Sequence, residues 1–264
     1  MALLHLNYRS KVLGLDQELS VILPESVDLE DQELTDIPVI YLLHGMGGNE
    51  LTWLRNTRLA RLVRHTKVAV VMPSTSLGWY TNTTYGMNYF DALAIELPEK
   101  IHEFFPQLST NKEKNFVCGL SMGGYGAFKF AFGTNRFSYA ASLSGALDLN
   151  AMDHSLIKDE QQLAYWQGIF GDIDQFSGSK NDLFTMAKEQ VTHQKDLPHL
   201  FVWIGTDDPL YQSNQTAVKE FKNLGYDLKY QEARGRHEWY YWDQQLEEVL
   251  RWLPIDYIGE ERLS

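Results

Sequence analysis

Cysteine is almost absent from this chain of 264 residues, which contains only Cys118. A lone thiol cannot form an intramolecular disulfide, and it cannot supply a CxxC pair or a cluster of cysteine and histidine ligands. The sequence therefore predicts no disulfide framework and no metal site of this kind. Because Cys118 lies in an apolar, strand-like segment, we expect its thiol to be buried and unreactive.

Basic side chains are scarce relative to acidic ones. The chain has 23 lysine and arginine residues against 35 aspartate and glutamate residues, a formal net charge of −12. No segment concentrates lysine and arginine, so the sequence lacks the positive patch that binds nucleic acid or an anionic membrane surface. We expect neither as a partner.

Long apolar runs are missing as well. No run approaches the roughly 18 residues that a membrane-spanning helix needs. The first residues also lack the basic region, apolar stretch and small-residue cleavage site of a secretory signal peptide. These absences predict a cytoplasmic protein without a membrane span.

Short apolar segments alternate along the chain with segments of helical periodicity. This alternation is typical of an α/β protein with a mostly parallel central sheet and helices on both faces. The strands are expected at 39–43, 68–72, 116–119, 140–143 and 200–205, with a more mixed one at 228–232, and the helices at 54–65, 89–105, 124–132, 214–224 and 240–253.

The two ends of this pattern differ from its middle. Residues 3–6, 9–13 and 19–23 are apolar or alternating around a turn at 14–16, which predicts an antiparallel start. Residues 148–195 interrupt the alternation with a connection of more than forty residues that contains several aromatic side chains. Connections this long are commonly functional. We interpret 1–264 as one domain in which 148–195 is an inserted cap or lid.

A nucleophile motif lies at the end of the third expected parallel strand. The sequence Gly119-Leu120-Ser121-Met122-Gly123 follows an apolar strand and leads into a helical segment. This is the context of a nucleophile elbow, in which a sharp turn presents the serine hydroxyl at a helix N-terminus. The alternative interpretation is that Ser121 only caps the helix.

A serine nucleophile needs a histidine base that a carboxylate orients. His237 follows the last expected strand, in the position that the chain order Ser, acid, His of α/β-hydrolases requires. Asp207 and Asp208 both follow the preceding strand, and the residues alone leave either as the acid. Asp148 is a weaker third candidate, because it follows an earlier strand.

A glycine-rich segment follows the first parallel strand, with the sequence His44-Gly45-Met46-Gly47-Gly48. Glycines here let backbone N–H groups approach a ligand, and in α/β-hydrolases this loop and the residue after the nucleophile, Met122, form the oxyanion hole. We expect His44 to hold the loop by hydrogen bonds. The segment has neither GxxxxGK[ST] nor GxGxxG spacing, so no nucleotide cofactor is expected.

Four motifs together resemble the esterase D family, which includes S-formylglutathione hydrolases and the tributyrin-type short-chain esterases of Gram-positive bacteria. They are HGMGGN at 44–49, GLSMGGYGA at 119–127, GTDDPLY at 205–211 and RGRHEWYYW at 234–242. The resemblance implies an α/β-hydrolase fold, selects Asp208 over Asp207 as the acid and assigns an oxyanion-hole N–H to Met46. S-formylglutathione hydrolases usually have Gly-His-Ser at the elbow and Ser-Gly-Leu in the loop, so Leu120 and His44-Gly45-Met46 favour the carboxylesterase branch.

The resulting hypothesis is a serine carboxylesterase that acts on small esters with short acyl chains, without a cofactor or metal. Trp79 and Tyr80 follow the second parallel strand and are expected to line the acyl or alcohol pocket. The resemblance to tributyrin-type esterases implies a homo-oligomer. The alternatives are an S-formylglutathione hydrolase, an acyltransferase with the same triad, and a binding protein on a hydrolase fold.

Overall fold

A central sheet of eight strands organises the molecule, and its middle strands are almost wholly buried. The computed structural model describes residues 1–29, 33–150, 157, 159–193 and 196–259. The strand order in the sheet is β1-β2-β4-β3-β5-β6-β7-β8. The strands are β1 (Ala2–Arg9), β2 (Asp16–Leu23), β3 (Val39–Leu43), β4 (Ala69–Pro73), β5 (Asn115–Leu120), β6 (Tyr139–Leu143), β7 (His199–Gly205) and β8 (Leu228–Ala233).

The pairing of the strands confirms the predicted mostly parallel sheet. From β4 to β8 all neighbours run parallel, whereas β1 and β2 pair antiparallel with each other and β2 runs antiparallel to β4. The β1–β2 turn contains Gly14, whose φ of +70° is accessible to glycine at no steric cost. The predicted antiparallel start is therefore confirmed too.

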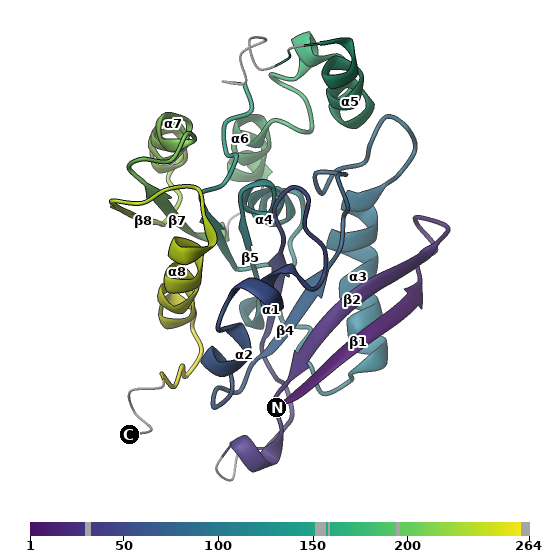
Figure 1. The fold of residues 1–264 in the computed structure, drawn as a ribbon, viewed down its shortest axis with the longest axis vertical. Helices are drawn as coiled ribbons and strands as arrows, with labels where there is room; N and C mark the ends of the chain where they lie inside the picture. Colours follow the sequence, from purple (N-terminus) through teal and green to yellow (C-terminus); the bar gives the residue numbers. More distant parts are fainter. Residues whose placement is uncertain (30–32, 151–156, 158, 194–195, 260–264) are drawn as a thin grey trace.

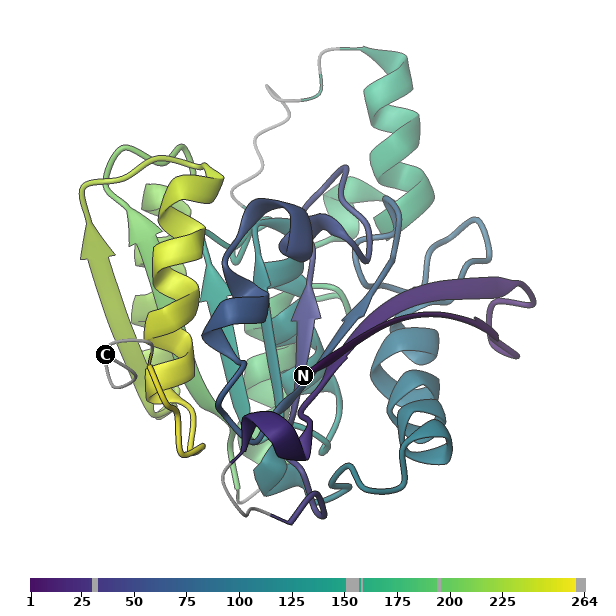
Figure 2. The same ribbon diagram turned by 60° about the horizontal axis from the view of Figure 1, so that its bottom comes forward.

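Helices cover both faces of the sheet, and each layer packs on its own apolar cluster. One cluster involves α3 (Leu97–Phe104), α4 (Met122–Gly133), α6 (Leu183–His193) and α7 (Tyr211–Asn223). The other involves α1 (Thr52–Asn56), α2 (Leu59–Leu62) and α8 (Trp239–Trp252), which Figures 1 and 2 show together on one side of the sheet.

The long connection after β6 carries a helix outside these two layers. Figure 2 shows α5 (Glu160–Phe170) beyond the carboxyl ends of the strands, the edge where ligands bind in parallel sheets. Of the predicted insertion 148–195, residues 151–156, 158 and 194–195 lie outside the described residues. Within the described ranges, no helix is long and apolar enough to cross a membrane.

The helix predicted at 54–65 was wrong as one continuous element. The structure has two short helices, α1 and α2, separated at Thr57, which has extended backbone dihedrals. The Thr57 hydroxyl donates to the carbonyl of Trp53 and accepts from the N–H of Leu59. The Thr57 N–H keeps its helical bond to Trp53, while its extended backbone ends α1 and its hydroxyl satisfies the next free N–H, at Leu59.

The helix predicted at 89–105 also divides. Residues Asp91–Glu96 form a π-helix, η2, which leads into α3. Pro98 lies in the first turn of α3, where the N–H that proline lacks would be unpaired in any helix. The backbone hydrogen bonds thus change from the π-helical to the α-helical pattern ahead of Pro98, and the chain stays helical through this position.

Cys118 lies in the middle of β5 and is buried, as expected. Burial raises the pKa of its thiol to about 12. The thiolate is the reactive form of cysteine, so Cys118 acts as a small apolar side chain.

Candidate active site

Ser121 occupies a strained turn between β5 and α4. Its φ is +53° and its ψ is −118°, a backbone conformation that non-glycine residues rarely adopt. The flanking glycines have a steric reason. A Cβ at Gly119 would lie 2.2 Å from the carbonyl oxygen of Gly123, and a Cβ at Gly123 would lie 2.4 Å from the carbonyl oxygen of Leu43. The turn can therefore form only with glycine at both positions.

His237 bridges Ser121 and Asp208. Its Nε2 lies 3.0 Å from Oγ of Ser121, and its Nδ1 lies 2.9 Å from Oδ2 of Asp208. The three residues follow β5, β7 and β8, whose carboxyl ends share one edge of the sheet. In this arrangement His237 can accept the serine proton at Nε2 while the carboxylate holds its Nδ1–H.

The two adjacent aspartates face different surroundings. The Asp208 side chain is fully buried, and its second oxygen accepts from the N–H of Leu210 at 2.8 Å. The Asp207 side chain is half exposed and lies 3.6 Å from Arg234 on the surface. The structure thus brings Asp208 and not Asp207 to His237.

Trp242 supports the imidazole from α8. Its ring meets the His237 ring edge-to-face, with the centroids 4.9 Å apart. The Trp242 indole N–H donates to Oγ of Ser144, a residue that also has a positive φ of 50°. The sequence analysis missed this contact. The only signal available was the position of Trp242 five residues after His237, which is equally typical of core packing.

His44 holds the glycine-rich loop, as we expected. Its Nδ1 lies 2.7 Å from the carbonyl oxygen of Gly45, and its Nε2 accepts from the N–H of Thr75 at 3.1 Å. An Nε2 that accepts requires the tautomer with the proton on Nδ1. Burial lowers the pKa of His44 to about 4, so the ring is neutral near pH 7.

The two expected oxyanion-hole residues flank Ser121. Met122 is the first residue of α4, where a backbone N–H has no acceptor within the helix. Met46 follows Gly45, which lies close to Ser121. A Cβ atom built onto Gly45 would be 3.5 Å from the Cβ of Ser121. The loop therefore passes next to Ser121, and the elements that carry both N–H groups meet there.

A cleft of about 600 Å³ opens beside Ser121 and His237. The glycine-rich loop, α1 and the start of α8 all contribute to its lining. Its remaining walls mix polar, charged and aromatic side chains, contributed by Thr52, Arg55, Asn56, Leu120, Glu238, Trp239 and Trp242.

Trp79 and Tyr80 do not line this cleft. Tyr80 is fully buried, and its hydroxyl donates to the carbonyl oxygen of His44 at 2.9 Å. We correct the expectation that it forms a pocket wall, because its ring has no surface left for a ligand. The indole of Trp79 donates to the hydroxyl of Tyr165 in α5 at 2.9 Å. Both residues have a φ of +52°.

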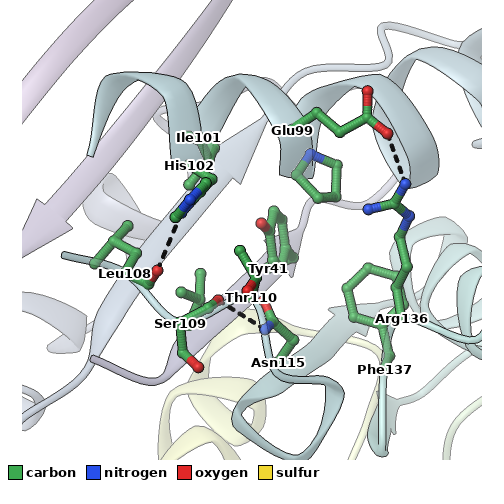
Figure 3. A pocket seen from close by; sticks show the side chains of 12 residues that line it. Tyr41, Glu99, Ile101, His102, Leu108, Ser109, Thr110, Asn115, Arg136 and Phe137 are labelled. Carbon is green, nitrogen blue, oxygen red and sulfur yellow. Dashed lines mark hydrogen bonds and ion pairs between the residues drawn. The ribbon is translucent and has the colours of Figure 1, made fainter. Parts of the chain in front are cut away.

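A second cavity, of about 210 Å³, lies at the opposite end of the sheet (Figure 3). It is formed by α3 and by the starts of β3 and β5, far from the strand ends that carry Ser121. Several of its polar side chains are bonded to protein partners: His102 to the carbonyl of Leu108, Asn115 to that of Ser109, and Arg136 to Glu99. The His102 ring contacts a backbone carbonyl here, unlike His237, whose ring lies against the hydroxyl of Ser121.

No group of three histidine, cysteine, aspartate or glutamate side chains that could hold a metal ion exists within the part of the chain that the structure describes.

Comparison with known proteins gives consistent matches. Residues 10–253 match the model of the Esterase family. An acetyl esterase of Caldicellulosiruptor saccharolyticus is 30% identical over 96% of this chain and 98% of that protein. Two Staphylococcus aureus structures each cover 96% of this chain and 98% of their own. They are the fluorophosphonate-binding serine hydrolase FphF (31% identity, TM-score 0.85) and the S-formylglutathione hydrolase FrmB (30%, 0.83).

Proposed function

Because this chain belongs to the Esterase family and is a serine ester hydrolase with an α/β-hydrolase fold, we propose that it uses Ser121, His237 and Asp208 as a catalytic triad. The observation that carries the proposal is the position of His237, within hydrogen-bond distance of both Ser121 and Asp208. The family match and the relatives also confirm the resemblance to the esterase D family.

In the proposed reaction, Oγ of Ser121 attacks the ester carbonyl while Nε2 of His237 takes its proton. The N–H groups of Met46 and Met122 stabilise the oxyanion of the tetrahedral intermediate, and each such donor typically contributes about 3 kcal/mol. His237 then protonates the departing alcohol, which leaves Ser121 acylated. A water molecule, deprotonated by His237, attacks this acyl-enzyme and releases the acid and free Ser121.

We propose that the substrates are short-chain esters, from acetyl to butyryl, including tributyrin and aryl esters. An acetyl esterase relative that matches nearly the whole chain supports this range. The cleft beside Ser121 is open and carries polar and charged side chains. Such walls accommodate a polar alcohol group more readily than a long acyl chain.

Arg55 favours a second candidate, hydrolysis of S-formylglutathione. This arginine is exposed in α1 and lines the cleft. A guanidinium binds carboxylates by paired hydrogen bonds, and the leaving thiol of this substrate carries two carboxylates. The FrmB relative from S. aureus supports the same candidate.

A panel of substrates distinguishes these candidates. We expect kcat/KM for p-nitrophenyl esters to be highest from acetyl to butyryl and to fall by octanoyl. A higher kcat/KM for S-formylglutathione than for every ester would replace the first candidate with the second. Adding an alcohol acceptor and measuring how product divides between acid and new ester tests acyl transfer. A product that is mainly the new ester would identify an acyltransferase.

We also propose that the chain is one domain in which the insertion 148–195 acts as a cap over the site. The contacts of α5 support this: Tyr165 accepts from Trp79, and its hydroxyl lies 3.9 Å from Sδ of Met46. Deleting α5 should change the preference for acyl length more than it changes turnover of acetyl esters.

The resemblance also leads us to propose a homo-oligomer, which sedimentation velocity tests.

A further inference from the structure

Lys129 is a buried lysine in the helix that begins at Ser121. It lies in α4, about two turns after Ser121, and its side chain is almost wholly buried. Its Nζ donates to Oγ1 of Thr81, to Oδ1 of Asn181 and, at 3.1 Å, to the hydroxyl of Tyr125. All three acceptors are neutral groups. Burial without a carboxylate is costly for a lysine, and it lowers the pKa of Lys129 well below its usual value.

The surrounding hydroxyls are arranged to accept from an ammonium group. Thr81 donates its own hydroxyl proton to Oδ1 of Asn181 at 2.6 Å, and Tyr125 donates its proton to the carbonyl oxygen of Asn181 at 2.8 Å. Both oxygens therefore offer only lone pairs to Lys129, and Nζ uses three donors. The Tyr125 ring adds a cation–π contact, with Nζ 5.4 Å from its centroid.

This network continues to the oxyanion loop. Thr81 directly follows Tyr80, whose ring packs against Gly126 of α4 so closely that a Cβ there would lie 2.4 Å away. The Tyr80 hydroxyl holds the carbonyl of His44, two residues before Met46. The segment is strained, with a φ of +52° at both Trp79 and Tyr80, so it needs contacts that hold it in this conformation.

We propose that Lys129 is a positioning residue for the oxyanion hole: its ammonium group fixes Thr81 and, through Tyr80, the loop that carries Met46. The proposal rests on the proposed function, in which the N–H groups of Met46 and Met122 bind the oxyanion together. Lys129 and Met122 both belong to α4. The lysine therefore sets the position of the Met46 N–H, on the loop, relative to the Met122 N–H, on the helix.

The first test compares Lys129→Met with the wild type. Methionine retains an unbranched apolar chain but removes the three donors. We expect kcat for p-nitrophenyl acetate to fall about tenfold to a hundredfold, because a small displacement of an oxyanion donor weakens mainly the transition state. KM should change less than threefold. Binding of a trifluoromethyl ketone, which forms a tetrahedral adduct at a serine, should weaken by the same factor as kcat.

Lys219→Met is the matched control, since Lys219 is an exposed lysine on α7. It should leave kcat and inhibitor binding unchanged. All measurements use active-site concentrations titrated with a fluorophosphonate, so a smaller folded fraction does not count as slower turnover. If kcat and ketone affinity of folded Lys129→Met stay within twofold of wild type, the proposal is wrong.

Thr81→Val decides the question if Lys129→Met does not fold. This substitution removes only the hydroxyl that links Lys129 to the segment of Trp79 and Tyr80. We expect the same loss of kcat and of ketone affinity as for Lys129→Met. Values within twofold of wild type would reject the proposal. Failure of the proposed function would look different. Wild-type protein would then lack esterase activity, or Ser121→Ala would retain it, whatever residue stands at 129.

Discussion

The Nε2 atom of His237 lies 3.0 Å from Oγ of Ser121, although the two residues are 116 positions apart in the chain. They meet because parallel strands place their carboxyl ends at one edge of the sheet, so that the turn after β5 and the loop after β8 converge. Transfer of the Ser121 proton to His237 in the proposed reaction depends on this distance.

Ser121→Ala should abolish ester hydrolysis. Without the hydroxyl no acyl-enzyme can form, and kcat for p-nitrophenyl acetate should fall on the order of a million-fold. Labelling by a fluorophosphonate probe should disappear as well. Ser177→Ala, at an exposed serine, is the control and should behave as wild type. Retention of more than a few percent of activity by pure Ser121→Ala would exclude Ser121 as the nucleophile.

The two aspartates should differ sharply in their effects. Asp208→Asn replaces the carboxylate that bonds Nδ1 of His237, and kcat should fall roughly ten-thousand-fold because the amide favours the wrong tautomer. Asp207→Asn removes only a half-exposed surface contact and should change kcat less than threefold. Steady-state kinetics of both purified variants provide the test. The reverse ranking would assign the acid to Asp207.

His44 should make stability depend on pH in a defined window. Burial lowers the pKa of His44 to about 4 in the folded state, against 6.5 for an unperturbed histidine. Between these values the unfolded chain binds the additional proton, so this contribution is complete above pH 6.5 and is lost as the pH falls toward 4. The stability advantage of wild type over His44→Gln should shrink by up to about 3 kcal/mol across this window.

Urea unfolding of both proteins at several pH values measures that difference. Carboxylates whose pKa is lowered in the fold, such as Asp28 and Asp36, weaken both proteins equally in acid and cancel from the comparison. A difference that stays constant between pH 6.5 and 4 would mean that His44 does not titrate as described.

Two glycine substitutions should change stability in opposite directions. Gly119→Ala would place a methyl group 2.2 Å from a backbone oxygen and should cost several kcal/mol or prevent folding. Gly168→Ala, within α5, places its methyl group no closer than 3.6 Å to any neighbour and should stabilise by about 0.5–1 kcal/mol. Thermal unfolding compares them. Equal melting temperatures would contradict the steric account of the elbow.

Patterns in the sequence predicted the parallel strands closely, because a strand buried on both faces must be apolar along its length. β3 matches its predicted range, and the other parallel strands differ only at their ends. The predictions were weaker for 54–65 and 89–105, where periodicity indicated helices but could not reveal breaks. The break at Thr57 lies where the threonine hydroxyl accepts from the N–H of Leu59, and the π-helix η2 lies just before Pro98 of α3.

The sequence by itself determined the parts of the site that depend on local chain geometry. Gly119 and Gly123 around Ser121 reflect steric limits within one turn, and the resemblance already selected Asp208. Only the tertiary structure placed the Asp208 carboxylate against His237, buried Tyr80 beneath the glycine-rich loop and enclosed Lys129 among neutral acceptors. The direction in which a side chain points from a loop is set by elements distant in the chain, and no local pattern encodes those contacts.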